Sequence, residues 1–393
     1  FHVTAIAAAG PAAFLFLRAA FHPSRLAPWL AAALAAPIPI WSAMQEAGRA
    51  DFHTESLALP IALLAAWAAV TGRTKLMLAF AAVILLAKED QGFTVFVIGA
   101  LAASRGAGSV RRSPIRRAGL LMMGASIIWT VLLIGVIMPA LRDGARLATD
   151  WYYGWILEDG GPVANLGRVV ERLTAVEGWM AAGGLLLSGA ALGLLRPAWL
   201  LLVLPPIVLS LLSANPAQAD IKLHYTLLPM VPLLVATALG GRRLLAIIGR
   251  RRRRGSLPPQ RRRLAGPMLL AFAVPALAVA WFGGGLPPTA RTARGQWDLP
   301  PAREQLLAFA AQVPDDVALT MDDGAAVALA SRRSLHLVSN RDPAAWVLVD
   351  RRAYVPGYQS QDRRDAFLAD LPTSGRELIA TDGRFELWGP VDE

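Results

Sequence analysis

The sequence predicts a mainly α-helical, polytopic transmembrane bundle, followed by a small extracytoplasmic α/β domain. Three observations support this fold class. The 393 residues are 55% hydrophobic and only 17% charged, which leaves too little polar surface for one water-soluble globule. Apolar runs of membrane length recur through residues 1–283. The composition then becomes polar, with 16 acidic and 12 basic residues from residue 291 onward.

Residues 1–283 form the expected transmembrane domain. Phe1 already lies inside an apolar run with no Met before it, so we expect an N-terminally truncated chain. A single helix over 76–104 would place three charges at mid-bilayer, at about 2.5–3.5 kcal/mol for each charge. We therefore expect two helices with a break at Lys88-Glu89-Asp90. The ten expected segments are 2–17, 26–45, 56–71, 76–87, 91–104, 118–140, 179–195, 197–213, 224–240 and 265–283.

The charges sort between the loops that join these segments. If the Arg-rich loop 241–263 is cytoplasmic, alternation places 20 of the 27 Lys and Arg residues before residue 290 on that side. All twelve acids before residue 290 then face the other side. This is the charge distribution of a multi-pass plasma-membrane protein. The basic loops need no partner beyond anionic membrane lipid, so no nucleic-acid partner is expected.

Two further regions lie on the extracytoplasmic side in this topology. Residues 151–155 are rich in Trp and Tyr, which suit the headgroup level, and 163–176 repeat apolar residues at the spacing of a helix lying on the membrane surface. Residues 284–296 are the expected linker, and 297–393 the expected soluble α/β domain. Its expected helices are 302–312, 323–330 and 363–370, and its expected strands 317–320, 335–338, 346–349, 376–381 and 384–388.

Asp51, His53 and Glu55 form the first polar cluster. Because they alternate, an extended chain places all three on one side. Their oxygen and nitrogen ligands could hold a divalent cation such as Mg²⁺ or Mn²⁺. The alternative is that Asp51 and Glu55 stabilise the N-terminus of the helix over 56–71. Capping explains one acid but leaves His53 unexplained.

Lys88-Glu89-Asp90 is the second cluster. In the functional interpretation Lys88 contacts an anionic phosphate, while Glu89 or Asp90 serves as a metal ligand or positions a proton acceptor. In the alternative, the three residues are an internally compensated ion pair within a helical hairpin.

Lys222 lies on the same side beside His224 and Tyr225, which indicates a phosphate pocket. Simple interfacial placement is the alternative for Lys222 and His224. The sequence has no Walker loop, Rossmann glycine fingerprint, HExxH motif or nucleophile elbow. It also has no cysteine, which excludes disulfides and thiolate metal sites.

These segments resemble a known family. Asp51–Pro60, Ala87–Gly92 and His224-Tyr225 are similar to the DFHPE-like, KED-like and HY motifs of the bacterial membrane proteins grouped as domain of unknown function 2079. Thr54 stands where that family usually has proline. The family is similar to the GT-C glycosyltransferases, which take a sugar from a polyprenyl-phosphate donor on the extracytoplasmic side. Such enzymes generally carry a catalytic acid in the first extracytoplasmic loop, which the expected truncation would remove.

The resemblance implies a bacterial plasma-membrane glycosyltransferase with an extracytoplasmic C-terminal domain. Its partners would be membrane lipids and a polyprenyl-phosphate-linked sugar. Two alternatives stay open: a transporter or flippase, which would carry charges deep within several helices, and a non-catalytic scaffold that recruits a partner. The candidate residues are Asp51, Glu55, Glu89 and Asp90 for catalysis, His53, Lys88, Lys222, His224 and Tyr225 for substrate binding, and Asp51, His53 and Glu89 for a Mg²⁺ or Mn²⁺ ion.

Overall fold

The chain divides into two compact units, Phe1–Thr289 and Ala290–Glu393, and each is described by itself. The boundary between them falls within residues 284–296, where the sequence places the linker. The structure is a computed structural model. It describes residues 2–41, 43–44, 47, 54–105, 114–141, 152–157, 161–214, 218, 225, 227–253, 270–271, 273–275, 277–278, 299–321, 329, 332–338, 344–351 and 361–391.

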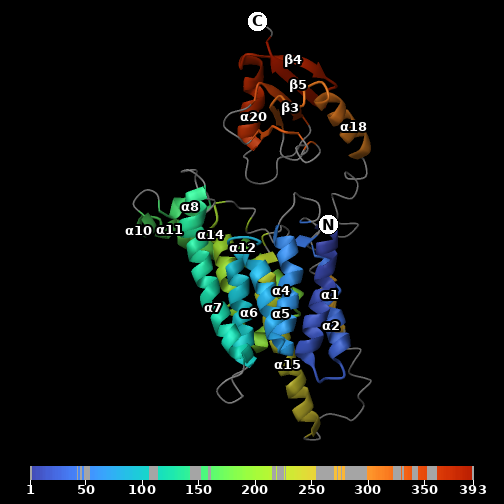
Figure 1. Cartoon of the computed structure of the whole chain (residues 1–393), viewed down its shortest axis with the longest axis vertical. Coiled ribbons are helices and arrows are strands. Elements are labelled where there is room, and N and C mark those ends of the chain that lie inside the picture. Colours follow the sequence, from blue (N-terminus) through green and yellow to red (C-terminus); the bar gives the residue numbers. More distant parts are fainter. Residues whose placement is uncertain are drawn as a thin grey trace. The chain divides into compact units, whose positions relative to one another are not determined.

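The first unit is a bundle of helices (Figure 1). Four helical stretches are long and apolar enough to cross a membrane, at 4–21, 54–71, 114–141 and 227–250. Shorter apolar helices occupy 27–40, 74–85 and 197–212. The elements are α1 (His2–Phe21), α2 (Ala27–Ala35), η1 (Ile38–Ile40), α4 (Thr54–Thr71), α5 (Thr74–Leu85), α6 (Gln91–Arg105), α7 (Pro114–Leu132), η3 (Leu133–Ile137), α8 (Met138–Leu141), η4 (Gly154–Ile156), α10 (Gly161–Ala164), α11 (Leu166–Thr174), α12 (Val176–Ser188), η5 (Leu192–Leu195), α13 (Pro197–Leu200), α14 (Leu204–Leu212) and α15 (Leu227–Arg253).

The predicted polytopic bundle is confirmed, since every expected segment up to residue 240 contains helix. The segment at 265–283 lies mostly outside the described residues, and the parts of it that are described are helical. One boundary was wrong: the last long helix was expected to end at 240, whereas α15 continues to Arg253. The extension is rich in Arg and Leu, which are good helix formers, so basic composition alone did not end the helix.

The expected break within 76–104 is confirmed, because α5 ends at Leu85 and α6 begins at Gln91. Lys88, Glu89 and Asp90 lie in this break. The last turn of α5 keeps a hydrogen-bond partner there, since the indole N–H of Trp129 in α7 donates to the carbonyl of Leu85 at 3.0 Å. Such partners replace the intrahelical bonds that a helix end lacks.

Helices α6 and α7 approach each other through glycines. A Cβ added to Gly99 would lie 2.7 Å from the carbonyl oxygen of Gly119, and one added to Gly119 would lie 2.5 Å from that of Gly99. Close backbone contact through small residues is typical of helix pairs in membranes. On its other face α7 exposes large apolar side chains, with Leu121 72% and Ile128 62% exposed. Helix α7 therefore lies at the lipid-facing edge of the bundle.

The two ends of the bundle differ in charge. Helices α4 and α6 run in the same direction, because Glu55 at the start of α4 contacts Lys88 just before α6, while Arg105 at the end of α6 donates to the carbonyl of Val70 near the end of α4. The starting end carries Glu55, Glu89 and Asp90. The opposite end carries Arg73, Lys75, Arg105, Arg116 and Arg117. The charge sorting expected from the sequence is therefore present along these helices.

The second unit is a five-stranded sheet between two helices (Figure 1). The strand order is β2-β1-β3-β5-β4, with β1 parallel to β2 and β3, and β5 antiparallel to β3 and β4. Alternate residues of β3 serve the two faces, as the pleat requires: Leu348 packs in the cluster that includes Leu306 of α18, and Val347 in the cluster of Leu368 of α20. The elements are α18 (Leu299–Ala310), β1 (Leu319–Met321), β2 (Leu335–Leu337), β3 (Trp346–Asp350), α20 (Gln361–Asp370), η10 (Leu371–Thr373), β4 (Arg376–Thr381) and β5 (Phe385–Pro390).

This α/β fold confirms the expectation for the C-terminal region, strand by strand. The helix expected at 323–330 lies almost entirely outside the described residues.

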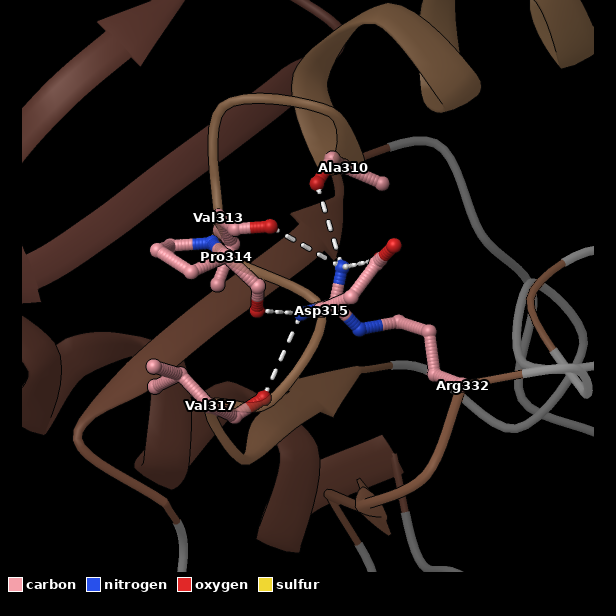
Figure 2. Close-up of polar contacts among 6 residues, drawn as sticks. All are labelled: Ala310, Val313, Pro314, Asp315, Val317 and Arg332. Carbon is pink, nitrogen blue, oxygen red and sulfur yellow. Dashed lines mark hydrogen bonds and ion pairs between the residues drawn. The ribbon is translucent and has the colours of Figure 1, made fainter.

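Arg332 fixes the segment that joins α18 to β1 (Figure 2). Its side chain is only 5% exposed. Its guanidinium donates to the carbonyls of Ala310, Val313, Pro314 and Val317, three of these bonds being 3.1 to 3.3 Å long. The planar guanidinium, with several fixed N–H donors, suits this role better than a lysine would. One buried side chain thus satisfies the carbonyls that follow the end of α18.

We expect Arg332→Ala to destabilise the second unit by roughly 2–4 kcal/mol, because four carbonyls, three of them in partly buried hydrogen bonds, lose their donor. Hydrogen exchange of the full-length chain should show loss of protection in β1 and at the end of α18. The exposed neighbour Arg333 provides the matched control. Equal protection in Arg332→Ala and Arg333→Ala would contradict this structural role.

Candidate functional site

Glu55 and Lys88 bring the two polar clusters of the sequence together. Glu55 lies in the first turn of α4 and is 6% exposed, while Lys88 lies 33 residues later in the break between α5 and α6. The Lys88 ammonium donates to Glu55 Oε1 in an ion pair. The same Nζ lies 3.4 Å from Asp90 Oδ2. Lys88 therefore stands between two carboxylates that come from different parts of the chain.

The neighbouring polar groups lie at the same helix ends. Gln91, the first residue of α6, is 4% exposed and donates from Nε2 to Asp90 Oδ1 at 3.0 Å, which fixes one oxygen of that carboxylate. The hydroxyls of Ser56 in α4 and Thr94 in α6 are buried and have no hydrogen-bond partner among the described residues. Buried polar groups are usually satisfied, so such hydroxyls are candidates for bonding to water or to a ligand.

Tyr153 adds a phenol that the sequence interpretation missed. Its hydroxyl lies 3.5 Å from Gln218 Oε1, and the charges of Asp90 and Lys88 both act on it. Burial raises the pKa of Tyr153 to about 12, so it is a neutral hydrogen-bond donor at physiological pH. From the sequence, the aromatic run at 151–155 indicated anchoring at the lipid headgroups. The only sequence signal that Tyr153 belongs to the site was that this run is expected on the same side of the membrane as the two polar clusters.

Hydrogen bonds hold the Tyr153 segment against the end of α14. The Tyr152 carbonyl accepts from the Ala214 N–H at 2.7 Å, and the Trp155 indole donates to the Leu212 carbonyl at 3.0 Å. From α11, the predicted amphipathic helix, the guanidinium carbons of Arg168 and Arg172 lie 5.0 and 4.7 Å from the Trp155 ring centroid. These are cation–π contacts. Residues 152–157 are thus tied to the end of α14 and to α11.

Charge and burial act in opposite directions on the pKa of Lys88 and on that of Asp90. Burial works against the charged form of Lys88, but attraction to Asp90 and Glu55 outweighs it, so the pKa of Lys88 rises above its ordinary value. Burial raises the pKa of Asp90 to about 6, and the Lys88 charge only partly offsets this. Lys88 is therefore a permanent cation, whereas Asp90 exchanges a proton near neutral pH. Their side chains are 27% and 31% exposed, which leaves both within reach of a ligand.

The other predicted site residues are placed only in part. Glu89 lies in the same break as Lys88 and is half-buried, and Tyr225 lies two residues before α15. Asp51 and His53 fall outside the described residues, as do Lys222 and His224.

The predicted metal site stays a prediction. Within the described part of the chain, no three His, Asp or Glu residues lie close enough together to hold a metal ion. The expected Mg²⁺ or Mn²⁺ ligands combine Glu89 with Asp51 and His53, and two of these three are not described. Of the described carboxylates, Glu55 is already engaged by Lys88.

The chain is similar in sequence to a known family of membrane proteins. Residues 1–257 match the family described as "Predicted membrane protein (DUF2079)". The chain belongs to this family. The resemblance drawn from the polar motifs is thereby confirmed. The matched residues include Glu55, Lys88 and Asp90 of the site. No curated protein matches the sequence of the chain.

One matching solved structure is ArnT from Cupriavidus metallidurans bound to undecaprenyl phosphate, a GT-C glycosyltransferase. The match covers 98% of this chain and 83% of ArnT, at 14% identity and a TM-score of 0.42. The expected similarity to GT-C proteins is thus present as a similarity in structure to ArnT. At this TM-score the likeness carries no argument about the activity of the DUF2079 chain.

The Glu55–Lys88 pair should show strong energetic coupling in a double-mutant cycle. We expect Lys88→Met and Glu55→Gln each to destabilise the detergent-solubilised chain. Lys88→Met removes the cation that offsets the buried Glu55 charge, and Glu55→Gln leaves Lys88, among its ion-pair partners in the described part of the chain, with only the Asp90 carboxylate at 3.4 Å. The double variant should recover roughly 1–3 kcal/mol relative to the sum of the single changes. Strictly additive effects on unfolding would contradict the ion pair.

Asp90 should make stability depend on pH. Its pKa is raised to about 6 from an ordinary value of 3.8, so the folded chain holds this proton more tightly than the unfolded chain. The protonated form therefore favours folding below about pH 4, and this contribution is lost as the pH rises through about 6.

Asp90→Asn, which stays neutral, should lack this dependence. The stability of the natural chain minus that of Asp90→Asn should fall between about pH 4 and 7 in thermal unfolding. Glu171→Gln, which changes an exposed acid of α11, is the control. A difference that stays constant over this range would show that Asp90 has an ordinary environment.

Proposed function

We propose that the chain is a GT-C-type integral membrane glycosyltransferase, which moves a sugar from a polyprenyl-phosphate donor to an extracytoplasmic acceptor. The observation that carries the proposal is the convergence of Glu55, Lys88 and Asp90 at one end of the bundle. This cluster combines a cation that can bind phosphate with a carboxylate that exchanges protons near neutral pH. ArnT is bound to undecaprenyl phosphate, a lipid of the same chemical class as the proposed donor.

Lys88 has the properties required of a group that binds the donor phosphate. Its charge is permanent, because the flanking carboxylates favour the ammonium form. In the proposed reaction, an acceptor hydroxyl oxygen attacks the anomeric carbon of the sugar, and the bond from that carbon to the phosphate oxygen breaks. The bonding electrons leave with the polyprenyl phosphate. Lys88 then stabilises the negative charge that develops on the leaving oxygen.

Asp90 is the best-placed proton acceptor among the described residues. A general base works best when its pKa lies near the working pH, and burial brings the pKa of Asp90 to about 6. Glu55 is less suited, because it is buried and bound to Lys88. When Asp90 takes the proton of the acceptor hydroxyl, it loses its negative charge beside Lys88, which favours the negative charge that develops on the leaving phosphate. A Mg²⁺ or Mn²⁺ ion held by Asp51, His53 and Glu89 would add Lewis-acid stabilisation of the phosphate.

The distribution of acids favours this function over a transporter or flippase. A proton or ion relay needs charged groups deep within several helices. The described acids of α4 and of the α5–α6 break instead lie at helix ends. We further infer that the end carrying the site faces the outside of the cell, because the Arg-rich end has the composition of cytoplasmic loops. With one more crossing at 265–283, the second unit is also extracytoplasmic.

A scaffold function has one observation in its favour. Strand β4 lies at an edge of the sheet, and its Leu378 and Ile379 are 44% and 41% exposed. Exposed edge strands can pair with another chain. A normal phenotype in variants of both polar clusters would favour this alternative.

The proposed function is tested by binding of a radiolabelled polyprenyl-phosphate sugar to the full-length protein. Lys88→Ala should weaken binding on the order of tenfold to a hundredfold, as loss of a charge-assisted hydrogen bond predicts. Glu89→Ala should also weaken it. Lys75→Ala, which removes an exposed lysine at the opposite end of α5, should have no effect. Unchanged binding in both site variants would contradict the proposal.

A further inference from the structure

An apolar groove lies between α6 and α7, directly beside the polar site. Its walls include Phe93 and Phe96 of α6 and Ile127 and Val131 of α7, and its upper end is at Gly92. The groove has a volume of about 370 Å³, which falls within the roughly 300–1,000 Å³ of typical ligand pockets. None of the charged groups described above lines it.

Small residues hold the two helices together along this groove. A Cβ added to Gly92 would lie 1.9 Å from Thr130 Oγ1, so α6 begins in direct contact with α7. The backbones meet again at Gly99 and Gly119. The groove is therefore built into a tightly packed helix pair.

The groove opens toward lipid. Ile127 is 54% and Val131 64% exposed, and they lie on the lipid-facing helix α7. Ser126, a hydroxyl residue in the lining, donates its hydrogen bond to the Met123 carbonyl at 2.9 Å. The lining is thus almost entirely apolar, and a hydrocarbon chain could enter it from the bilayer without first passing through water.

The upper end of the groove reaches the polar site. Gly92 follows Gln91, whose amide donates to Asp90, and Asp90 in turn lies 3.4 Å from the Lys88 ammonium. On the α7 wall of the groove, the π-helical element η3 begins at Leu133, two residues after Val131. Such π-helical turns within α-helices occur frequently at functional sites. A ligand with an anionic head and one long chain could therefore contact Lys88 and the groove at the same time.

We propose that the α6–α7 groove binds the hydrocarbon chain of the polyprenyl phosphate whose phosphate is held by Lys88. The assignment rests on the proposed function and adds the position of the lipid chain. Among the described residues, this groove lies beside Lys88, and the combination fits a lipid phosphate with one chain. A bilayer phospholipid carries two chains, of which this groove would hold only one.

The test compares a long and a short phosphate in the full-length protein. The long probe is radiolabelled undecaprenyl phosphate, and the short probe is isopentenyl phosphate, which has one isoprene unit. Val131→Trp fills the groove with an indole at an exposed position, and Ile127→Trp is the second variant. Leu121→Trp is the matched control, because it adds the same indole to a 72% exposed position of α7 outside the groove.

Both groove variants should weaken binding of the long probe on the order of tenfold, since several methylenes lose their apolar contacts. Neither should change binding of the short probe, and Leu121→Trp should change neither. Lys88→Ala should weaken binding of both probes. Gel filtration and thermal unfolding verify that each variant is folded.

Three outcomes would overturn the groove assignment. The first is normal binding of the long probe in both groove variants while Lys88→Ala weakens it, which leaves the proposed function standing. The second is that the groove variants weaken binding of the long probe and of the short probe equally. The third is equal displacement of the long probe by phosphatidylglycerol, which would show that the groove holds ordinary bilayer lipid. If Lys88→Ala binds both probes normally, the proposed function fails as well.

Discussion

The contact between Glu55 and Lys88 is the constraint on which the polar end of the bundle depends. Glu55 is almost fully buried among apolar helices, where an unpaired carboxylate would be very costly. Lys88 supplies the opposite charge only because the chain is broken between α5 and α6 and can bring this residue to the start of α4. The break and the ion pair therefore require each other. Both carboxylates that flank Lys88 also keep it charged, and its side chain is 27% exposed.

The same break determines what surrounds the site. Because α6 begins at Gln91, its first turn carries the amide that fixes Asp90 and the glycine that meets α7. The Trp129 bond to the Leu85 carbonyl holds α7 against the end of α5. A cluster of charged side chains and an apolar groove thus lie side by side over a few residues of α6. This is the arrangement that recognition of an amphiphile requires, because its charged and hydrocarbon parts need environments of opposite polarity.

The second unit is stabilised by packing on the two faces of its sheet. Its sheet is covered on both faces, by α18 and α20, and its alternating strand residues divide between the two cores. Arg332 shows how a charge can serve structure alone, since its guanidinium satisfies carbonyls that a helix end leaves without donors. A buried charge in this chain is therefore not by itself a sign of function. In the first unit, Lys88 and Asp90 are instead partly exposed, and burial raises the pKa of Asp90 to about 6.

The sequence by itself determined the transmembrane class, the break at Lys88-Glu89-Asp90, the sorting of charges and nearly every strand of the C-terminal unit. These features depend on composition and on periodicities of two or 3.6 residues, which are local properties of the chain. Only the tertiary structure decided that Lys88 pairs with Glu55, that the charges of Asp90 and Lys88 act on Tyr153, and that α6 and α7 leave a groove. Such pairings depend on how each helix is rotated and how closely its small residues let it approach a neighbour. That geometry arises from packing between segments far apart in the chain, and no local pattern encodes it.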